Sequence, residues 1–150
     1  MGLAPSGPGA AFAGNLVDML RLARALRDEM VAHARADHPD EACGLVAGVD
    51  GEATRVIRMT NIARSPTFYE MDPGEQLHVF REMDDRDEEL FVIYHSHTAT
   101  EAYPSRTDIS IAGYPDAHYV LVSTRQPDVE EFRSFRIVDG VVTEEPVEVV

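Results

Sequence analysis

The chain lacks residues on which several classes of protein depend. Its 150 residues include no lysine, no tryptophan and a single cysteine. The absence of lysine excludes Schiff-base and lysine-nucleophile chemistry. One cysteine forms neither an intramolecular disulfide framework nor a cysteine-based zinc knuckle, so a reducing compartment is expected. No apolar run approaches the roughly 20 residues that span a bilayer, and we therefore expect a cytoplasmic protein without a membrane partner.

Positive charge is also scarce. The 13 arginines stand against 27 acidic residues, which gives a net charge of -14 and a pI near 4.6. A field of this sign repels polyanions, so nucleic acid is not an expected partner. The remaining composition, 44% hydrophobic and 27% charged, is ordinary for one globular domain.

The order of helical and strand patterns indicates a single α/β domain. Residues 1–14, mostly Gly, Ala, Pro and Ser, are expected to be a disordered leader, and residues 15–150 the domain. Apolar residues at helical spacing predict helices over 23–38, from Pro73 into the acidic run 84–89, and within 105–112. Strands are expected at 43–49, 54–59, 90–94, 119–123, 131–138 and 141–149. Residues 18–22 fit either a short strand, which we favour, or the first turns of the helix that follows.

The residues that follow the expected strand 90–94 carry the clearest chemical signal. His95-Ser96-His97 places two imidazoles on the same face of an extended chain, and Asp108 follows downstream. Two nitrogen ligands, one oxygen ligand and an open fourth position are typical of a catalytic zinc site, where the pKa of bound water falls to about 7. A histidine pair at a strand end is by itself more often a surface feature, so the added carboxylate is what favours a metal.

Glu41 and Ser105 complete the candidate set, and each also has a structural interpretation. Glu41 begins a buried strand, where a carboxylate has little structural reason to be, and hydrolysis at such a site needs a proton shuttle. Its alternative is an ion pair with an arginine. Ser105 opens a Ser-Arg-Thr-Asp sequence of capping-box form, so it is also expected to cap the following helix, and the two roles can coexist.

Together these positions, Glu41, His95-Ser96-His97, Ser105 and Asp108, match the motif of the JAMM (MPN+) metallopeptidases throughout. The stretches HPDEACGLVAG, TNIARSPTFYEMDPGEQL, VIYHSHTATEAYPSRTD and DAHYVLVSTR resemble the Mec-type subfamily of actinobacteria, which cleaves cysteine from a ubiquitin-like sulfur-carrier protein. The resemblance runs from about Asp18 to the C-terminus. It implies one MPN/JAMM domain of cytidine-deaminase-like fold, with a mixed, mainly antiparallel sheet flanked by helices.

The resemblance also implies a role for each residue. Zn²⁺ is bound by His95, His97 and Asp108, with water in the fourth position. Glu41 is the general base that deprotonates this water and then passes the proton to the leaving amine. Ser105 donates a hydrogen bond to the oxyanion of the tetrahedral intermediate. The implied partner is a sulfur carrier ending Gly-Gly, with an attached cysteine or a C-terminal extension.

Three further functions deserve comparison with the release of cysteine from a carrier. A processing peptidase that trims a longer extension from a carrier precursor has the same motif, and spacing does not separate the two. A non-catalytic MPN scaffold would lack the metal ligands, which are all present here. A zinc deaminase requires His-x-Glu followed by Cys-x-x-Cys, and the single cysteine excludes that signature.

Substrate recognition is less sharply indicated. The segment 61–71 and the loop 98–104 are candidates to line the groove, with an extended Gly-Gly tail adding to a strand edge. Arg64 or Arg106 could pair with the carboxylate of a departing cysteine, and a surface ion pair is the alternative for either. Cys43 is expected to be a small core residue near the site. The other histidines suggest no second metal: His33 and His38 on a helix surface or end, His78 on a helix face and His118 in a loop.

Overall fold

The structure, a computed structural model, describes residues 19–150, so the expected leader over residues 1–14 lies outside the described residues. A six-stranded sheet in the order β3-β2-β4-β5-β6-β7 forms the centre, and a two-stranded sheet pairs β1 with β8. Within the central sheet only β4 and β5 run parallel. The prediction of a mixed, mainly antiparallel sheet flanked by helices is confirmed.

Most elements lie where the sequence patterns place them, within one or two residues. The elements are β1 (Leu20–Leu22), α2 (Arg24–Asp37), β2 (Cys43–Val49), β3 (Glu52–Met59), α3 (Pro73–Asp85), β4 (Glu89–His97), α4 (Arg106–Ile111), β5 (His118–Ser123), β6 (Glu131–Val138), β7 (Val141–Glu145) and β8 (Val147–Val149).

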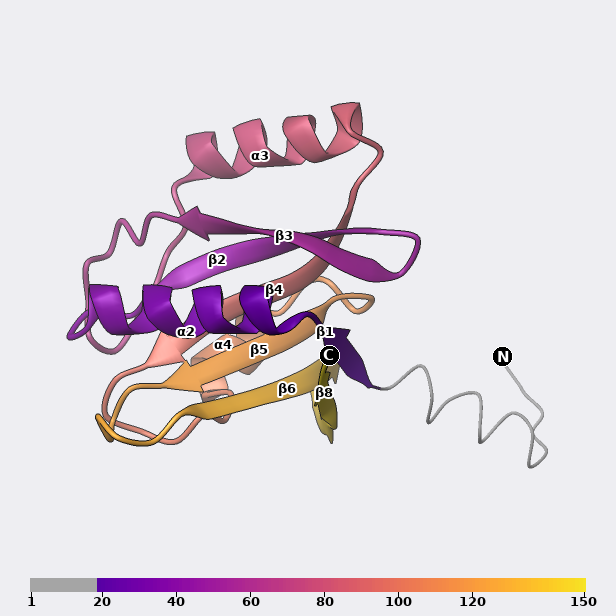
Figure 1. Ribbon diagram of the computed structural model, residues 1–150. Helices are drawn as coiled ribbons and strands as arrows, with labels where there is room; N and C mark the ends of the chain where they lie inside the picture. The colour runs from indigo at the N-terminus through magenta and orange to yellow at the C-terminus, as the bar shows by residue number, and fades with distance from the viewer. Residues whose placement is uncertain (1–18) are drawn as a thin grey trace.

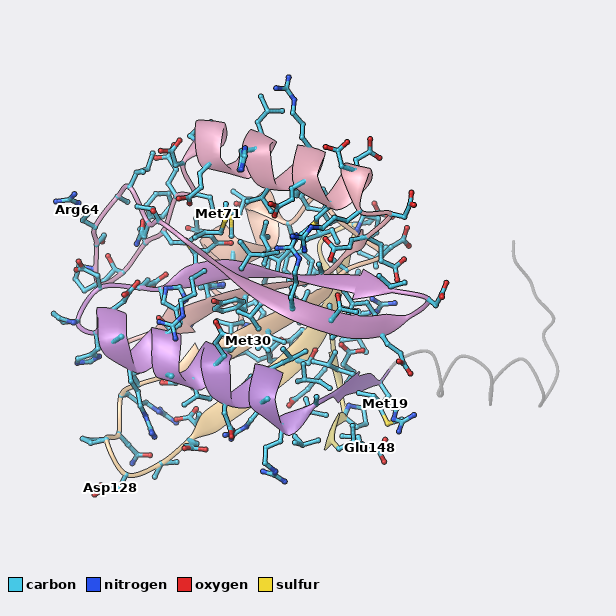
Figure 2. The ribbon with its side chains drawn as sticks, turned by 45° about the horizontal axis from the view of Figure 1, so that its top comes forward. Met19, Met30, Arg64, Met71, Asp128 and Glu148 are labelled. Carbon is cyan, nitrogen blue, oxygen red and sulfur yellow. The ribbon has the colours of Figure 1, made fainter. Side chains whose placement is uncertain are left out.

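Helices cover both faces of the central sheet, which explains the near-continuous apolar runs of its middle strands. On one face α2 packs Met30 and Val31 against β2, β4 and β5 (Figures 1 and 2). On the other face α3 and α4 pack against the alternate residues of the same strands, including Leu45 and Leu121. Each fully buried side chain of this size contributes about 1.5–3 kcal/mol, so both layers stabilise the sheet that carries the site.

The contact between α2 and the sheet corrects the prediction for His33. Its imidazole is not on the helix surface but buried, because the Nδ1 atom is hydrogen-bonded with the Tyr94 hydroxyl at 2.7 Å. The Tyr94 ring reaches this position by crossing the backbone of Gly44, where a Cβ atom would lie 2.2 Å from the ring. Glycine at position 44 is therefore required by close packing.

Two other predictions were wrong. His118 is the first residue of β5 rather than a loop residue, and it is buried against Glu145 of β7. The single strand expected over 141–149 is two strands, because Pro146 has no N–H for the ladder and lets the chain leave the central sheet. The part after Pro146, β8, pairs in parallel with β1.

Within residues 19–150, no helix is both long and apolar enough to cross a membrane.

Candidate metal centre and active site

The two motif histidines lie at the carboxyl end of β4. The strand continues through His97, three residues beyond its predicted end, so His95 and His97 alternate with Ser96 and point to the same face. Asp108 approaches them from the first turn of α4, which begins at Arg106. A strand end and a helix start thus bring the three side chains together, and we call them the ligand cluster.

The atoms of the ligand cluster converge on one point. The Nε2 atoms of His95 and His97 each lie 3.1 Å from the same Asp108 oxygen, Oδ2. One ligand atom from each residue lies within 4.8 Å of the others. Bonds of 2.0–2.2 Å in a tetrahedral zinc site place ligand atoms about 3.3 Å apart. Two nitrogens and one oxygen with these spacings therefore fit a zinc ion.

Electrostatics within the cluster favour an ionised carboxylate. Burial raises the pKa of Asp108, but hydrogen bonds with His95 and His97 outweigh it and hold this pKa far below its usual range. Burial lowers the pKa of His95. For His97 burial acts in the same direction, but the hydrogen bonds to Asp108 and Glu101 outweigh it and raise the pKa. The cluster thus keeps a negative oxygen between two imidazoles.

The orientation of His97 is fixed by its other ring nitrogen. Nδ1 donates to the carbonyl oxygen of Glu101 at 2.8 Å. When Nε2 carries a proton it donates to Asp108, and when the ring is neutral the lone pair lies on Nε2, toward the cluster. The loop that carries this carbonyl is tied down on both sides. Ser123 Oγ donates to the Thr100 carbonyl at 2.6 Å, and Ala102 N donates to the Glu131 carboxylate at 3.2 Å.

Glu41 lies beside the cluster because of strand register. Cys43 pairs with His95 in the antiparallel ladder of β2 and β4, and continuing this register places Glu41 opposite His97. Ser96 secures the arrangement, since its N–H donates to the Ala42 carbonyl and its Oγ accepts from Ala42 N at 2.8 Å. Glu41 is buried and, within residues 19–150, forms no ion pair with an arginine.

Burial raises the pKa of Glu41 to about 7, with His97 lowering it and Asp108 raising it in smaller measure. A carboxyl with a pKa close to neutrality can both accept and release a proton there. The structural alternative of an arginine ion pair is therefore wrong for the described residues, while the catalytic role remains a prediction.

Ser105 caps α4 as its sequence predicts. Its Oγ accepts from Asp108 N at 3.0 Å, and its own N–H donates to Asp108 Oδ2 at 2.8 Å, which is a capping box. The bond from Asp108 occupies a lone pair of the hydroxyl, so its proton remains able to donate elsewhere. Capping therefore orients Ser105 and Asp108 together and is compatible with an oxyanion contact.

A cleft of about 520 Å³ opens from the ligand cluster between the sheet, α3 and α4. Of the candidate site residues, His95 and Asp108 line this cleft, and most of the remaining wall is apolar. Its residues from outside the sheet include Phe68, Tyr69, Met71, Phe80, Ile111 and Tyr114. An apolar cleft with a few polar groups at one end is a common form of ligand site.

The segment 61–71 does contribute to the cleft wall, as expected. The Tyr69 ring stacks on His95, with centroids 4.5 Å apart and planes 29° apart. From the loop 98–104 only Pro104 lines the cleft. Arg64 is exposed, and its side chain extends away from the molecule (Figure 2). Arg106 is exposed too, and neither arginine is part of the cleft wall. Arg64 instead lines a second pocket, which also includes Glu41.

Cys43 is confirmed as a core residue. It is fully buried, and burial raises the pKa of its thiol to about 12, which keeps it protonated and unreactive. Sequence reasoning missed the supporting roles of Ser96 and Glu101. Strand alternation could have indicated Ser96, since it faces away from both histidines, but nothing local indicates that the carbonyl of Glu101 would meet His97.

Comparison with known proteins agrees with this geometry. Residues 23–138 match the family described as prokaryotic homologs of the JAB domain. The chain is 68% identical over 127 residues to the CysO-cysteine peptidase of Mycobacterium tuberculosis, covering 83% of this chain and 87% of that protein. It is 34% identical to the desampylase of Haloferax volcanii, covering 69% of this chain and 80% of that protein.

Solved structures show the same fold. A solution structure of a Desulfitobacterium hafniense protein superimposes with a TM-score of 0.78 at 36% identity, covering 88% of this chain and 93% of that one. A JAB1/MPN domain protein from Archaeoglobus fulgidus has a TM-score of 0.56 at 18% identity, covering 86% and 99%. The chain therefore belongs to the prokaryotic JAB family and is a JAB-type hydrolase with peptidases among its relatives.

Proposed function

We propose that this protein is a zinc-dependent peptidase that hydrolyses the amide between the C-terminal glycine of a ubiquitin-like sulfur carrier and an attached cysteine. The observation that carries the proposal is the convergence of two imidazole nitrogens and one carboxylate oxygen next to Glu41, at the end of a cleft. The 68% identity to a CysO-cysteine peptidase supports the substrate class.

His95, His97 and Asp108 would hold the zinc ion, because they supply the nitrogen and oxygen ligands that zinc prefers at matching spacings. When bound there, zinc lowers the pKa of water and polarises a carbonyl group. The Glu101 carbonyl keeps His97 in the tautomer that can bind a cation.

Glu41 moves the proton. Its carboxylate accepts a proton from the attacking water as the new C–O bond forms, and then gives that proton to the amide nitrogen as the C–N bond breaks. The products are the carrier with a free glycine carboxylate and cysteine with a free amine. The pKa of about 7 suits both halves of this transfer.

Ser105 stabilises the charge that develops on the carbonyl oxygen. Its hydroxyl accepts from Asp108 N, so the hydroxyl proton can donate to the oxyanion of the tetrahedral intermediate. Because α4 holds Ser105 and Asp108 in one capping box, the donor is positioned before the substrate arrives.

The carrier tail is proposed to lie extended in the cleft, with its glycines at the ligand cluster. Glycine lets the tail backbone approach His95 and Asp108 without a Cβ atom in the way. The apolar wall then receives the part of the tail that precedes the glycines.

A pair of substrates tests the proposal. One is a ubiquitin-like sulfur carrier ending Gly-Gly-Cys, and its match is the same carrier with several residues after Gly-Gly. We expect a higher kcat/KM for the cysteine adduct, with free cysteine as the product. A higher kcat/KM for the longer extension would assign the protein to precursor processing, and cleavage of neither would contradict both.

A further inference from the structure

Asn61 has no assigned role, yet it lies at the centre of the polar contacts behind the active site. It follows β3 closely, is buried, and forms an isolated bridge with Met71 at the other end of the segment 61–71. Its side-chain amide makes four hydrogen bonds, which use both donors and both acceptor positions. Nδ2 donates to the carbonyls of Glu41 (2.9 Å) and Phe68 (3.1 Å), and Oδ1 accepts from the amides of Ala63 (3.0 Å) and Glu70 (3.0 Å).

One group of contacts fixes the backbone of Glu41. Its carbonyl accepts from Asn61, and its N–H donates to the Ser65 carbonyl at 2.9 Å. Both polar backbone groups of Glu41 are thus bound to the segment 61–71, whereas those of the next residue, Ala42, are bound to Ser96. Where the Glu41 carboxylate lies relative to His97 therefore depends on the segment that Asn61 organises.

The other group of contacts fixes Tyr69. Phe68 and Glu70 are its two neighbours, and Asn61 binds the carbonyl of the first and the N–H of the second. The Tyr69 ring stacks on His95 and lines the cleft. The side-chain amide of Asn61 therefore contacts two parts of the site. It binds the backbone of Glu41, which lies opposite His97, and the backbone on both sides of Tyr69, which stacks on His95.

We propose that Asn61 is a positioning residue that holds Glu41 and Tyr69 as one unit against the ligand cluster. The inference rests on the proposed peptidase function, which gives Glu41 its reaction. Asparagine suits the position, because aspartate lacks both donors, serine is too short to reach four backbone groups, and glutamine carries an extra methylene in a buried site. A misplacement of about 1 Å at a reacting group can cost roughly 100-fold in rate.

The test compares Asn61→Ala, which removes four hydrogen bonds, with Ser134→Ala, which removes one buried hydrogen bond on the opposite face of the sheet. Ser134 Oγ donates to Glu145 at 2.6 Å, and Ser134 does not line the cleft. Zinc content, Tm, kcat and KM are measured on a carrier ending Gly-Gly-Cys. We expect Asn61→Ala to retain zinc while kcat falls roughly 10- to 100-fold, and Ser134→Ala to lower Tm with kcat unchanged.

Hydrogen exchange at the Glu41 amide supplies a readout that needs no substrate. This amide donates to Ser65 rather than to Asn61, so faster exchange in Asn61→Ala reports an effect transmitted through the segment. If wild type does not cleave the carrier, the proposed function fails, and this exchange rate alone decides the positioning role. Asn61→Ser replaces Asn61→Ala if the latter does not fold. Wild-type kcat with unchanged Glu41 exchange would overturn the proposal, as would a loss of kcat that only follows a loss of zinc.

Discussion

Two buried clusters of histidine and carboxylate lie on opposite faces of the central sheet, and only one of them brings three ligand atoms together beside a cleft. The ligand cluster directs two imidazole nitrogens at one carboxylate oxygen and opens into the cleft. In the second, which we call the rear cluster, His118 Nδ1 donates to Glu145 Oε2 at 2.5 Å and Ser134 Oγ donates to the same atom.

The histidines of both clusters are almost equally buried, at 4% exposure for His95 and 5% for His118. What differs is the use of their donors and acceptors. The rear cluster pairs a single imidazole nitrogen, His118 Nδ1, with its carboxylate, leaves Glu145 Oε1 without a hydrogen-bond partner among the described residues, and does not line the cleft. Burial of a histidine and a carboxylate therefore does not identify a site. Convergence of several ligand atoms on one point beside a cleft is what makes the ligand cluster the candidate metal site.

The largest difference is expected between two separate alanine variants, one for a histidine of each cluster. His95→Ala removes a ligand from the converging set, so zinc should be lost and turnover should fall by more than the roughly 100-fold that loss of a supporting partner costs. His118→Ala should retain both zinc and turnover. Zinc content and initial rates on each purified variant measure this, and equal losses in the two variants would remove the distinction between the clusters.

A second comparison replaces the carboxylates by amides. Glu41→Gln should keep zinc, because Glu41 is not one of the three ligands, while turnover falls about 10²–10⁴-fold with the loss of proton transfer. Glu145→Gln in the rear cluster should leave turnover unchanged. A zinc-loaded Glu41→Gln variant with near-normal turnover would exclude Glu41 from the mechanism.

The pKa of Glu41 should appear in the stability of the metal-free protein. Its folded-state pKa of about 7 lies above the ordinary value of 4.5, so between these pH values the folded state holds the proton more often than the unfolded state. The free energy of unfolding should therefore fall as pH rises through this window, by roughly 3 kcal/mol from this group.

Denaturant unfolding of wild type and Glu41→Gln at about pH 4.5, 6 and 8 covers the interval between the unfolded-state and folded-state pKa values of Glu41. The difference between the two proteins isolates the contribution of Glu41. We expect wild type to lose stability relative to the variant as pH rises. If the free energy of unfolding of wild type stays constant or rises relative to that of Glu41→Gln as pH increases, burial does not raise the pKa of Glu41.

The smallest difference, in zinc affinity, is expected between alanine variants of two buried serines. Ser123 donates to the Thr100 carbonyl at 2.6 Å, and Ser134 donates to Glu145 at the same distance. Either alanine variant should lower the free energy of unfolding by about 1–3 kcal/mol. Only Ser123→Ala should also weaken zinc binding, by up to about tenfold, because the Thr100 carbonyl precedes the Glu101 group that orients His97. Competition with a chelator measures the zinc affinity, and equal affinities would show that the loop does not act on His97.

Much of the ligand cluster could be predicted because its signal is local. Two histidines that alternate on a strand share a face whatever the strand pairs with, and the capping box sets Ser105 against Asp108 within one helical turn. The helices and most strands followed from apolar spacing for the same reason. Glu41 could be singled out as an unusual carboxylate at a buried strand, but its general-base role came from the family resemblance, since its place beside His97 depends on the register between β2 and β4.

The contacts that support the site could not be predicted in this way. Asn61 binds Glu41 from 20 positions away in the chain, and Ser123 reaches the Thr100 carbonyl from 23 positions away. The burial of His33 and His118 likewise depends on which strand or helix face lies opposite. These features arise from tertiary packing, and one sequence contains no periodic signal for them.

The most direct test of the proposed activity is the intact mass of a ubiquitin-like carrier ending Gly-Gly-Cys after incubation with the zinc-loaded protein. Parallel samples contain a chelator, or Glu41→Gln in place of wild type. We predict that the carrier loses the mass of one cysteine with wild type alone, and that the chelated and variant samples leave it intact. An unchanged carrier mass with zinc-loaded wild type, or cleavage that persists after zinc is removed, would contradict the proposed activity.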